Sequence, residues 1–103
     1  MAFQNTKARY ASFGIATNIP PEIIDSFWSV IDNNLKGVFK LDNILIFSIV
    51  NNKNKTAIEY NDRKKKIRIV IDTPFQFNPF LPKKIYVIDN KGTETILLAH
   101  EIH

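Results

Sequence analysis

The sequence has no cysteine, only three glycines and no long hydrophobic run. Without cysteine the chain has no disulfide, no thiolate metal site and no cysteine nucleophile, and it fits a reducing compartment. So few glycines argue against the glycine-rich phosphate loops of the common nucleotide-binding fingerprints. The longest strongly apolar run, Ile44 to Val50, is far shorter than the ~20 residues of a membrane-spanning helix. Because the N-terminal residues also lack the apolar core of a signal peptide, we expect a cytoplasmic protein without a membrane segment.

Length and composition are those of an ordinary globular protein. A chain of 103 residues has room for one hydrophobic core and not for two. An apolar fraction of 45% with 23% charged residues excludes a disordered chain. We therefore expect residues 1–103 to form a single globular domain.

One segment has clear helical periodicity. Pro21 suits the first position of a helix, and Glu22 in the first turn suits the positive end of the helix dipole. Gly37 provides a stop, since glycine readily adopts the left-handed conformation that ends many helices. An apolar stripe at helical spacing lies between these signals and predicts an amphipathic helix over residues 21–36. The stripe consists of Ile23, Ile24, Phe27, Trp28, Ile31 and Leu35.

The rest of the chain has the pattern of β-strands and turns. Residues 8–16 alternate at period two, and the apolar run 44–50 is typical of a central strand that is covered on both faces. Three prolines predict an irregular segment over 73–82. Residues 93–101 are interpreted as a strand, with a short helix as the alternative because Leu97, Leu98 and Ala99 are not β-branched. Further strands are expected at 56–60, 67–71 and 85–88.

Together these elements predict an α+β fold. We expect one amphipathic helix (about 21–36) packed on a mainly antiparallel sheet of about five or six strands. The helix should cover one face of the sheet, and the apolar segment 73–82 should help to cover the other.

Basic residues are concentrated in one short segment. Residues 63–68 read Arg-Lys-Lys-Lys-Ile-Arg, and the rest of the chain has nine basic residues against ten acidic ones, so the net charge of +4 comes from this segment. Such a cluster favours contact with an acidic protein surface or with nucleic-acid phosphates. The structural alternative is that these cations protect an exposed strand edge from aggregation. The candidate residues are Arg63, Lys64, Lys65, Lys66 and Arg68.

A second candidate is the phenylalanine segment at 73–82. Phe75, Phe77 and Phe80 would each gain roughly 1.5–3 kcal/mol from full burial, so we expect them to pack against something. One alternative is packing over the sheet of this same domain. The other is a surface for a protein partner or for a second copy of the chain in a homodimer.

No pattern of catalytic or metal-binding residues emerges. Asp25 and Asp32 share the polar surface of the predicted helix, which is ordinary for an amphipathic helix. His100 and His103 flank Glu101, but the spacing differs from that of the helical zinc motif, and a solvated tail is the ordinary interpretation. We therefore expect a protein that is not an enzyme and holds no metal or cofactor.

Several segments, in order along the chain, resemble a known family. They are Arg9-Tyr10 with Gly14-Ile15-Ala16, Ile19-Pro20-Pro21-Glu22 with Trp28, Leu41-Asp42 with Phe47, Ile85-Tyr86-Val87-Ile88-Asp89, and Thr95-Ile96-Leu97-Leu98-Ala99-His100-Glu101. The sequence resembles the domain of unknown function 960 family, small proteins from Gram-positive bacteria and their phages. The resemblance implies a cytoplasmic protein of one α+β domain and transfers no catalytic residue. Residues 51–82, which hold the basic and phenylalanine segments, depart from the family pattern.

The sequence thus favours a small, non-enzymatic protein-interaction module. The resemblance suggests an accessory protein of a bacterium, phage or mobile element, and one special case is an inhibitor of a host nuclease or defence complex. The alternative is a nucleic-acid-binding module that uses the basic 63–68 segment, although no aromatic residue interleaves that segment.

Overall fold

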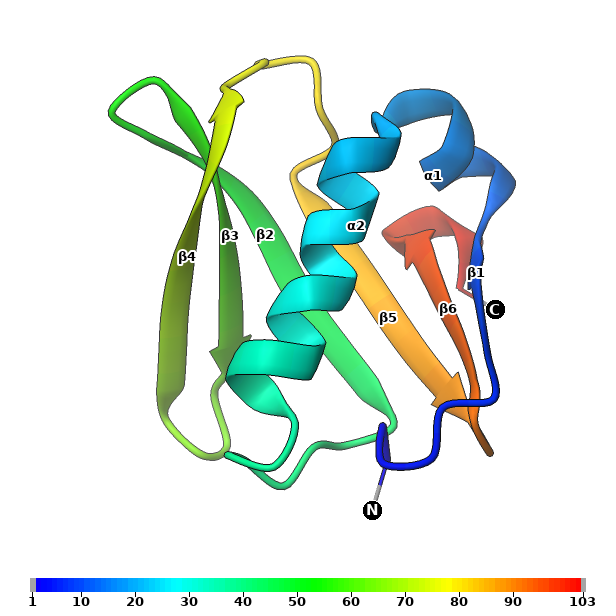
Figure 1. The fold of residues 1–103 in the computed structure, drawn as a ribbon. Coiled ribbons are helices and arrows are strands. Elements are labelled where there is room, and N and C mark those ends of the chain that lie inside the picture. Colours follow the sequence, from blue (N-terminus) through cyan, green and yellow to red (C-terminus); the bar gives the residue numbers. More distant parts are fainter. Residues whose placement is uncertain (1, 103) are drawn as a thin grey trace.

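The computed structural model describes residues 2–102, which form a six-stranded sheet with helices packed on one face (Figure 1). The strand order is β1-β6-β5-β2-β3-β4, and the β1–β6 pair is parallel whereas the other pairs are antiparallel. The predicted α+β class with a mainly antiparallel sheet is confirmed. The strands are β1 (Ala8–Ala11), β2 (Ile44–Asn52), β3 (Lys55–Asp62), β4 (Ile67–Gln76), β5 (Lys84–Asn90) and β6 (Thr93–Leu98).

The main helix begins where the proline signal places it. Pro20 is the N-cap and Pro21 opens α2 (Pro21–Val30), which continues as a π-helical turn, η1 (Ile31–Leu35). The backbone N–H of Lys36 donates to the carbonyl of Ile31, five residues earlier, at 2.8 Å. The predicted helix over 21–36 is therefore right to within one residue.

The hydrophobic core lies between this helix and one face of the sheet. Phe27 of α2 meets Phe47 of β2 edge-to-face, with ring centroids 5.4 Å apart, and Phe47 also contacts the Tyr60 ring of β3. The side chains that β2, β5 and β6 direct toward α2 are almost completely buried, namely Leu45, Phe47, Ile85, Val87 and Ile96. One contiguous cluster therefore joins the helix to the central strands.

The prediction of a strand over 8–16 is wrong beyond Ala11. Ser12 is the N-cap of a short helix, α1 (Phe13–Asn18), and its hydroxyl accepts a hydrogen bond from the Ile15 N–H at 3.2 Å. The apparent period-two pattern fails because Phe13 is exposed while Ile15 is buried. The α1 helix lies at the end of the molecule where α2 begins (Figure 1).

The prediction of an irregular segment over 73–82 is wrong for its first part. Strand β4 continues through Pro74 to Gln76, with a shift of register opposite Lys55 and Ala57. Proline is tolerated because β4 is an edge strand, where a missing N–H breaks no ladder on the outer side. At the other end of the sheet, the predicted strand over 93–101 is right as far as Leu98, after which a 3₁₀ turn, η2 (Ala99–Glu101), follows.

The sheet is covered on one face and open on the other, which corrects the prediction that β2 is covered on both faces. Ile44 and Ile46 point away from α2 and are 47% and 39% exposed. Phe75 and Phe77 pack against the same core as the helix, so the segment 73–82 does not cover the second face. A single layer of helices buries one face of the sheet only. None of the described helices is long and apolar enough to cross a membrane.

Candidate binding site on the open sheet face

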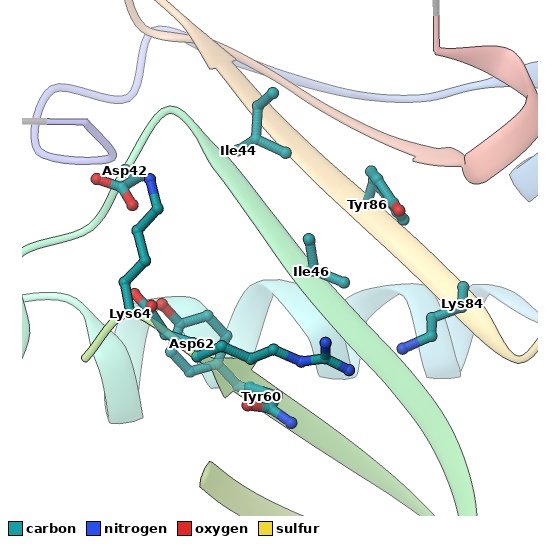
Figure 2. Close-up of a pocket in the computed structure, with 10 residues that line it drawn as sticks. Asp42, Ile44, Ile46, Tyr60, Asp62, Lys64, Lys84 and Tyr86 are labelled. Carbon is teal, nitrogen blue, oxygen red and sulfur yellow. The ribbon is translucent and has the colours of Figure 1, made fainter. Parts of the chain in front are cut away.

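A hollow of about 370 Å³ lies on the open face of the sheet (Figure 2). It spans strands β2 and β5 and reaches the turn between β3 and β4. Its lining residues come from three separate stretches of the chain, so only the folded sheet assembles it. They are Asp42, Ile44, Ile46, Tyr60, Asn61, Asp62, Arg63, Lys64, Lys84 and Tyr86.

The floor of the hollow is apolar. Ile46 of β2 lies directly opposite Tyr86 of β5 in the ladder, and Ile44 lies one pleat further along β2. These residues alternate with the buried Leu45 and Phe47, which fixes their direction away from the core. An aromatic ring and two branched aliphatic side chains therefore form one continuous surface that water contacts.

Charged groups form the rim of this floor. Lys84 extends from β5, and Arg63 and Lys64 extend from the β3–β4 turn. The carboxylates of Asp42 and Asp62 lie on the same rim (Figure 2). With three cations and two carboxylates, the rim has an excess of positive charge.

Contacts of Lys65 with Asp62 and Lys40 hold the basic turn in place. Its backbone N–H donates to Asp62 Oδ1 at 3.2 Å, and its Nζ lies 3.9 Å from Asp62 Oδ2. The same ammonium group also donates to the backbone carbonyl of Lys40. Lys65 therefore ties the turn to the loop before β2 and partly neutralises Asp62, while Arg63 and Lys64 line the hollow.

Tyr60 brings a hydroxyl group to the inner edge of the site. Burial raises the pKa of Tyr60 to about 12, and the negative charges of Asp62 and Asp42 add to this effect. The phenol is therefore neutral at physiological pH.

The sequence candidates do not form one site. Arg63 and Lys64 line the hollow, whereas Lys66 is exposed outside it. Arg68 lies further along β4 and pairs with Glu59, with Arg68 NH2 2.8 Å from Glu59 Oε2.

The three phenylalanines lie elsewhere and behave differently from one another. Phe75 and Phe77 are half-buried against the core, and Phe75 lines a small groove with Pro20, Ile23 and Leu81. Phe80 is 92% exposed, so the alternative in which the segment packs over the sheet of this same domain fails for Phe80. Their segment comprises the last residues of β4 and the loop after it, at the end of the sheet opposite the basic turn (Figure 1).

Sequence reasoning missed the floor of the hollow. The apolar run 44–50 predicts cover on both faces for Ile44 and Ile46, and no sequence motif contains Lys84 together with Tyr86. A signal was present in β5, where Lys84 and Tyr86 alternate with the buried Ile85 and Val87. That alternation indicates a strand with one wet face.

The carboxylates with the strongest local interactions lie outside the hollow. Glu94 is fully buried, and its oxygens accept hydrogen bonds from the Thr6 hydroxyl (2.6 Å) and Arg9 Nε (2.9 Å). Asp32 accepts hydrogen bonds from both terminal nitrogens of Arg9, at 2.8 Å from NH1 and 2.6 Å from NH2. These contacts, first of all the hydrogen bond from Arg9, lower the pKa of Asp32. The guanidinium also lies 4.7 Å from the centre of the Trp28 ring, so this network binds β1 to β6 and to α2.

The remaining candidates for chemistry are dispersed. Asp25 is exposed on α2, and His100 is exposed in η2, while His103 lies outside the described residues. Between residues 2 and 102, no three histidine, cysteine or acidic side chains gather as ligands of a metal ion would.

The fold and sequence have relatives of known structure and family. A crystal structure of the protein of unknown function from Enterococcus faecalis is similar, with a TM-score of 0.90 and 37% identity over 94% of this chain and 92% of that chain. Among curated proteins, no match was found. Residues 8–101 match the family described as "Staphylococcal protein of unknown function (DUF960)". The resemblance noted from the sequence is thereby confirmed, and the chain belongs to this family.

Proposed function

We propose that the protein is a non-enzymatic interaction module that docks a protein partner on the open face of its sheet. The observation that carries the proposal is the exposure of Ile44 and Ile46 beside Tyr86, on the face of the sheet that lies opposite α2. A contiguous apolar patch exposed on a protein surface is typical of an interaction site.

The rim defines the chemistry of the partner. Arg63, Lys64 and Lys84 surround the apolar floor, so the complementary surface has one or two apolar side chains flanked by carboxylates. A partner side chain that fills the hollow gains roughly 1.5–3 kcal/mol from burial, and the cations steer its approach. An accessory protein that inhibits a nuclease or defence complex would be one form of this function, with an acidic surface of the target on the sheet.

The test is capture of partners from a cytoplasmic extract of a Gram-positive host, with three baits in parallel. The baits are the wild-type protein, Ile46→Asp on the floor, and Val38→Asp as a matched control, since Val38 is 64% exposed outside the hollow. Partners retained by wild type and by Val38→Asp, but lost with Ile46→Asp, support the proposal. Binding of a purified partner should weaken at least about tenfold in Ile46→Asp, which corresponds to about 1.4 kcal/mol. Equal retention by all three baits rejects the open face as the docking surface.

A second candidate function is binding of single-stranded nucleic acid on the same face. Its specific support is that Tyr86 provides an aromatic surface next to Lys84, Arg63 and Lys64, the combination that stacks a base and pairs with phosphates. The sequence alone offered no aromatic partner for the basic segment. Salt titration separates the two functions, because phosphate contacts give a log–log slope of about −0.7 per contact. Absence of binding to single-stranded probes at low salt eliminates this candidate.

A further inference from the structure

Strand β4 presents a long unpaired edge. It has ten residues and pairs with β3 on one side, and no other strand of residues 2–102 pairs with its outer side. Its core-facing isoleucines, Ile67, Ile69 and Ile71, are only half-buried, and the outward-facing Val70 is 36% exposed. A long edge with apolar residues on both faces favours pairing with another strand.

Ladder geometry shows which backbone groups face the free edge. The turn between β2 and β3 consists of Lys53 and Asn54, both at positive φ, and closes on the hydrogen-bonded pair Asn52–Lys55. Because pair types alternate along an antiparallel ladder, Ile58 and Tyr60 direct their backbone groups toward β4. Their partners there are Ile71 and Ile69. The intervening residues Arg68, Val70 and Asp72 therefore direct their N–H and C=O groups away from β3.

The side chains along this edge are self-complementary around Val70. Arg68 and Asp72 lie two residues before and after it, on the same open face of the sheet. We propose that two copies of the chain pair β4 with β4 in antiparallel register about Val70, forming a continuous twelve-stranded sheet. In this register Arg68 lies opposite Asp72 of the partner subunit, and Val70 lies opposite its own copy. Ile69 lies opposite Ile71 of the partner subunit on the core face.

Arg68 and Asp72 can each form a further hydrogen bond, as this pairing requires. Arg68 is 67% exposed and uses Nε and NH2 on Glu59, which leaves NH1 for another carboxylate. Asp72 Oδ1 accepts from Asn52 Nδ2 at 2.7 Å, and Oδ2 has no hydrogen bond to the described part of the chain. Each Arg68–Asp72 contact across the two-fold axis therefore adds to the pairs already present within each subunit.

The core face has space for the partner. A hollow of about 140 Å³ lies between α2 and β4, lined by Val30 and Ile71 with a polar rim that includes Ser26 and Ser29. Ile69 of the partner subunit would approach Ile71 at the mouth of this hollow. The half-exposed isoleucines of both copies would then be covered by one another rather than by water.

Charge favours the antiparallel direction of the two β4 strands, and Pro74 sets the end of the shared ladder. A parallel pair would place the two basic turns, residues 63–66, side by side, whereas the antiparallel pair places them at opposite ends. Pro74 has no N–H to offer on the outer edge, so it ends the shared ladder after residue 73. The edge therefore specifies one antiparallel register, and repulsion between the cations of 63–66 disfavours parallel pairing.

The experiment is sedimentation equilibrium of the full chain, for which the proposal predicts twice the subunit mass of 11.9 kDa. Val70→Pro removes an N–H that faces the edge and not β3, so the subunit should fold and sediment as a monomer. Asp72→Lys places a lysine opposite Arg68 of the partner subunit and should weaken the dimer about tenfold. The double variant Arg68→Asp with Asp72→Lys restores opposite charges and should regain the dimer. Circular dichroism confirms folding of each variant.

Ile46→Asp serves as the control, because it changes the open face and leaves the β4 edge intact. A dimer that persists in Ile46→Asp and dissociates in Val70→Pro supports edge pairing, whatever the fate of the proposed partner site. A wild-type chain that remains monomeric at about 100 µM overturns the inference. A dimer that survives Val70→Pro but dissociates in Ile46→Asp also overturns it, since the two copies would then meet through their open faces.

Discussion

Arg9 connects several separate parts of the chain. It joins β1 to the buried Glu94 of β6 and to Asp32 of η1, while its guanidinium covers the Trp28 ring. These contacts raise the pKa of Arg9, chiefly through the hydrogen bond with Asp32, so the charge is permanent. A buried carboxylate requires such a partner, because desolvation without one is costly.

Substitution of Arg9 by methionine tests this dependence. Arg9→Met leaves Glu94 buried with only the Thr6 hydroxyl, and we expect a loss of about 3 kcal/mol in the free energy of unfolding. Asp32→Asn is the matched control. It removes a partner that is 40% exposed and should cost less than about 1 kcal/mol. Urea unfolding measures both changes, and equal losses would contradict the central role of Glu94.

Glu101 provides a second long-range contact and a pH-dependent one. Its carboxylate accepts from the Ser12 hydroxyl (2.6 Å), the Leu98 N–H (2.8 Å) and the Gly14 N–H (3.1 Å). The hydrogen bond from Ser12, followed by those from the two backbone groups, lowers the pKa of Glu101 below its ordinary value of 4.5. A lowered folded-state pKa means that the stabilisation is complete above pH 4.5 and is lost as the pH falls through the folded-state value.

Glu101→Gln should therefore change the pH profile of stability. The wild-type protein is expected to be more stable than the variant at neutral pH, and the difference should shrink as the pH falls below 4.5. Thermal unfolding at a series of pH values measures the difference. A constant difference between pH 7 and pH 2 would show that the carboxylate charge contributes nothing.

At the scale of elements, α1 depends on a contact with Glu101, a residue far from the helix in the sequence. Ser12 caps the helix, and Glu101 from the other end of the chain occupies the same N-terminal turn. A Cβ on Gly14 would lie 2.8 Å from Leu98 Cδ1 and 2.9 Å from Glu101 Oε1. A side chain at this position would therefore displace Leu98 and Glu101, which favours glycine although alanine has the higher helix propensity.

Gly14→Ala should accordingly destabilise the protein, against the usual direction of a helical glycine-to-alanine change. The displaced Glu101 and Leu98 side chains should cost about 1–3 kcal/mol in the free energy of unfolding. Ala16→Gly in the same helix is the comparison, with an exposed site and a cost of about 1 kcal/mol from propensity alone. A stabilised Gly14→Ala variant would show that Glu101 does not pack there.

At the scale of the whole molecule, the two faces of the sheet differ in what they tolerate. Leu45 is 1% exposed on the core face, and its neighbour Ile46 is 39% exposed on the open face. We expect Leu45→Ala to cost about 2–5 kcal/mol and Ile46→Ala to cost less than about 1 kcal/mol. Chemical denaturation compares the pair. Similar losses would mean that both faces of the sheet are covered.

Part of this fold and part of its site follow from local patterns. Pro21 and the isoleucine stripe predict α2, and the alternation at 67–71 predicts β4, because capping and side-chain direction depend on neighbours within a few residues. The basic residues of the site, Arg63 and Lys64, were also found, since charge is visible in composition. The apolar floor was not found, because Ile44 and Ile46 look the same in the sequence whether they face a core or water.

The sequence by itself determined the types of most elements, the class of the fold and the place of the positive charge. The tertiary structure alone decided which face of the sheet stays open, because a single helix layer can bury only one face. It also decided that Ser12 begins a helix and that Pro74 remains in a strand. The helix after Ser12 depends on the contact with Glu101 from the far end of the chain. Pro74 is accommodated because β4 is an edge strand. Contacts between residues distant in sequence set these outcomes, and no local pattern contains them.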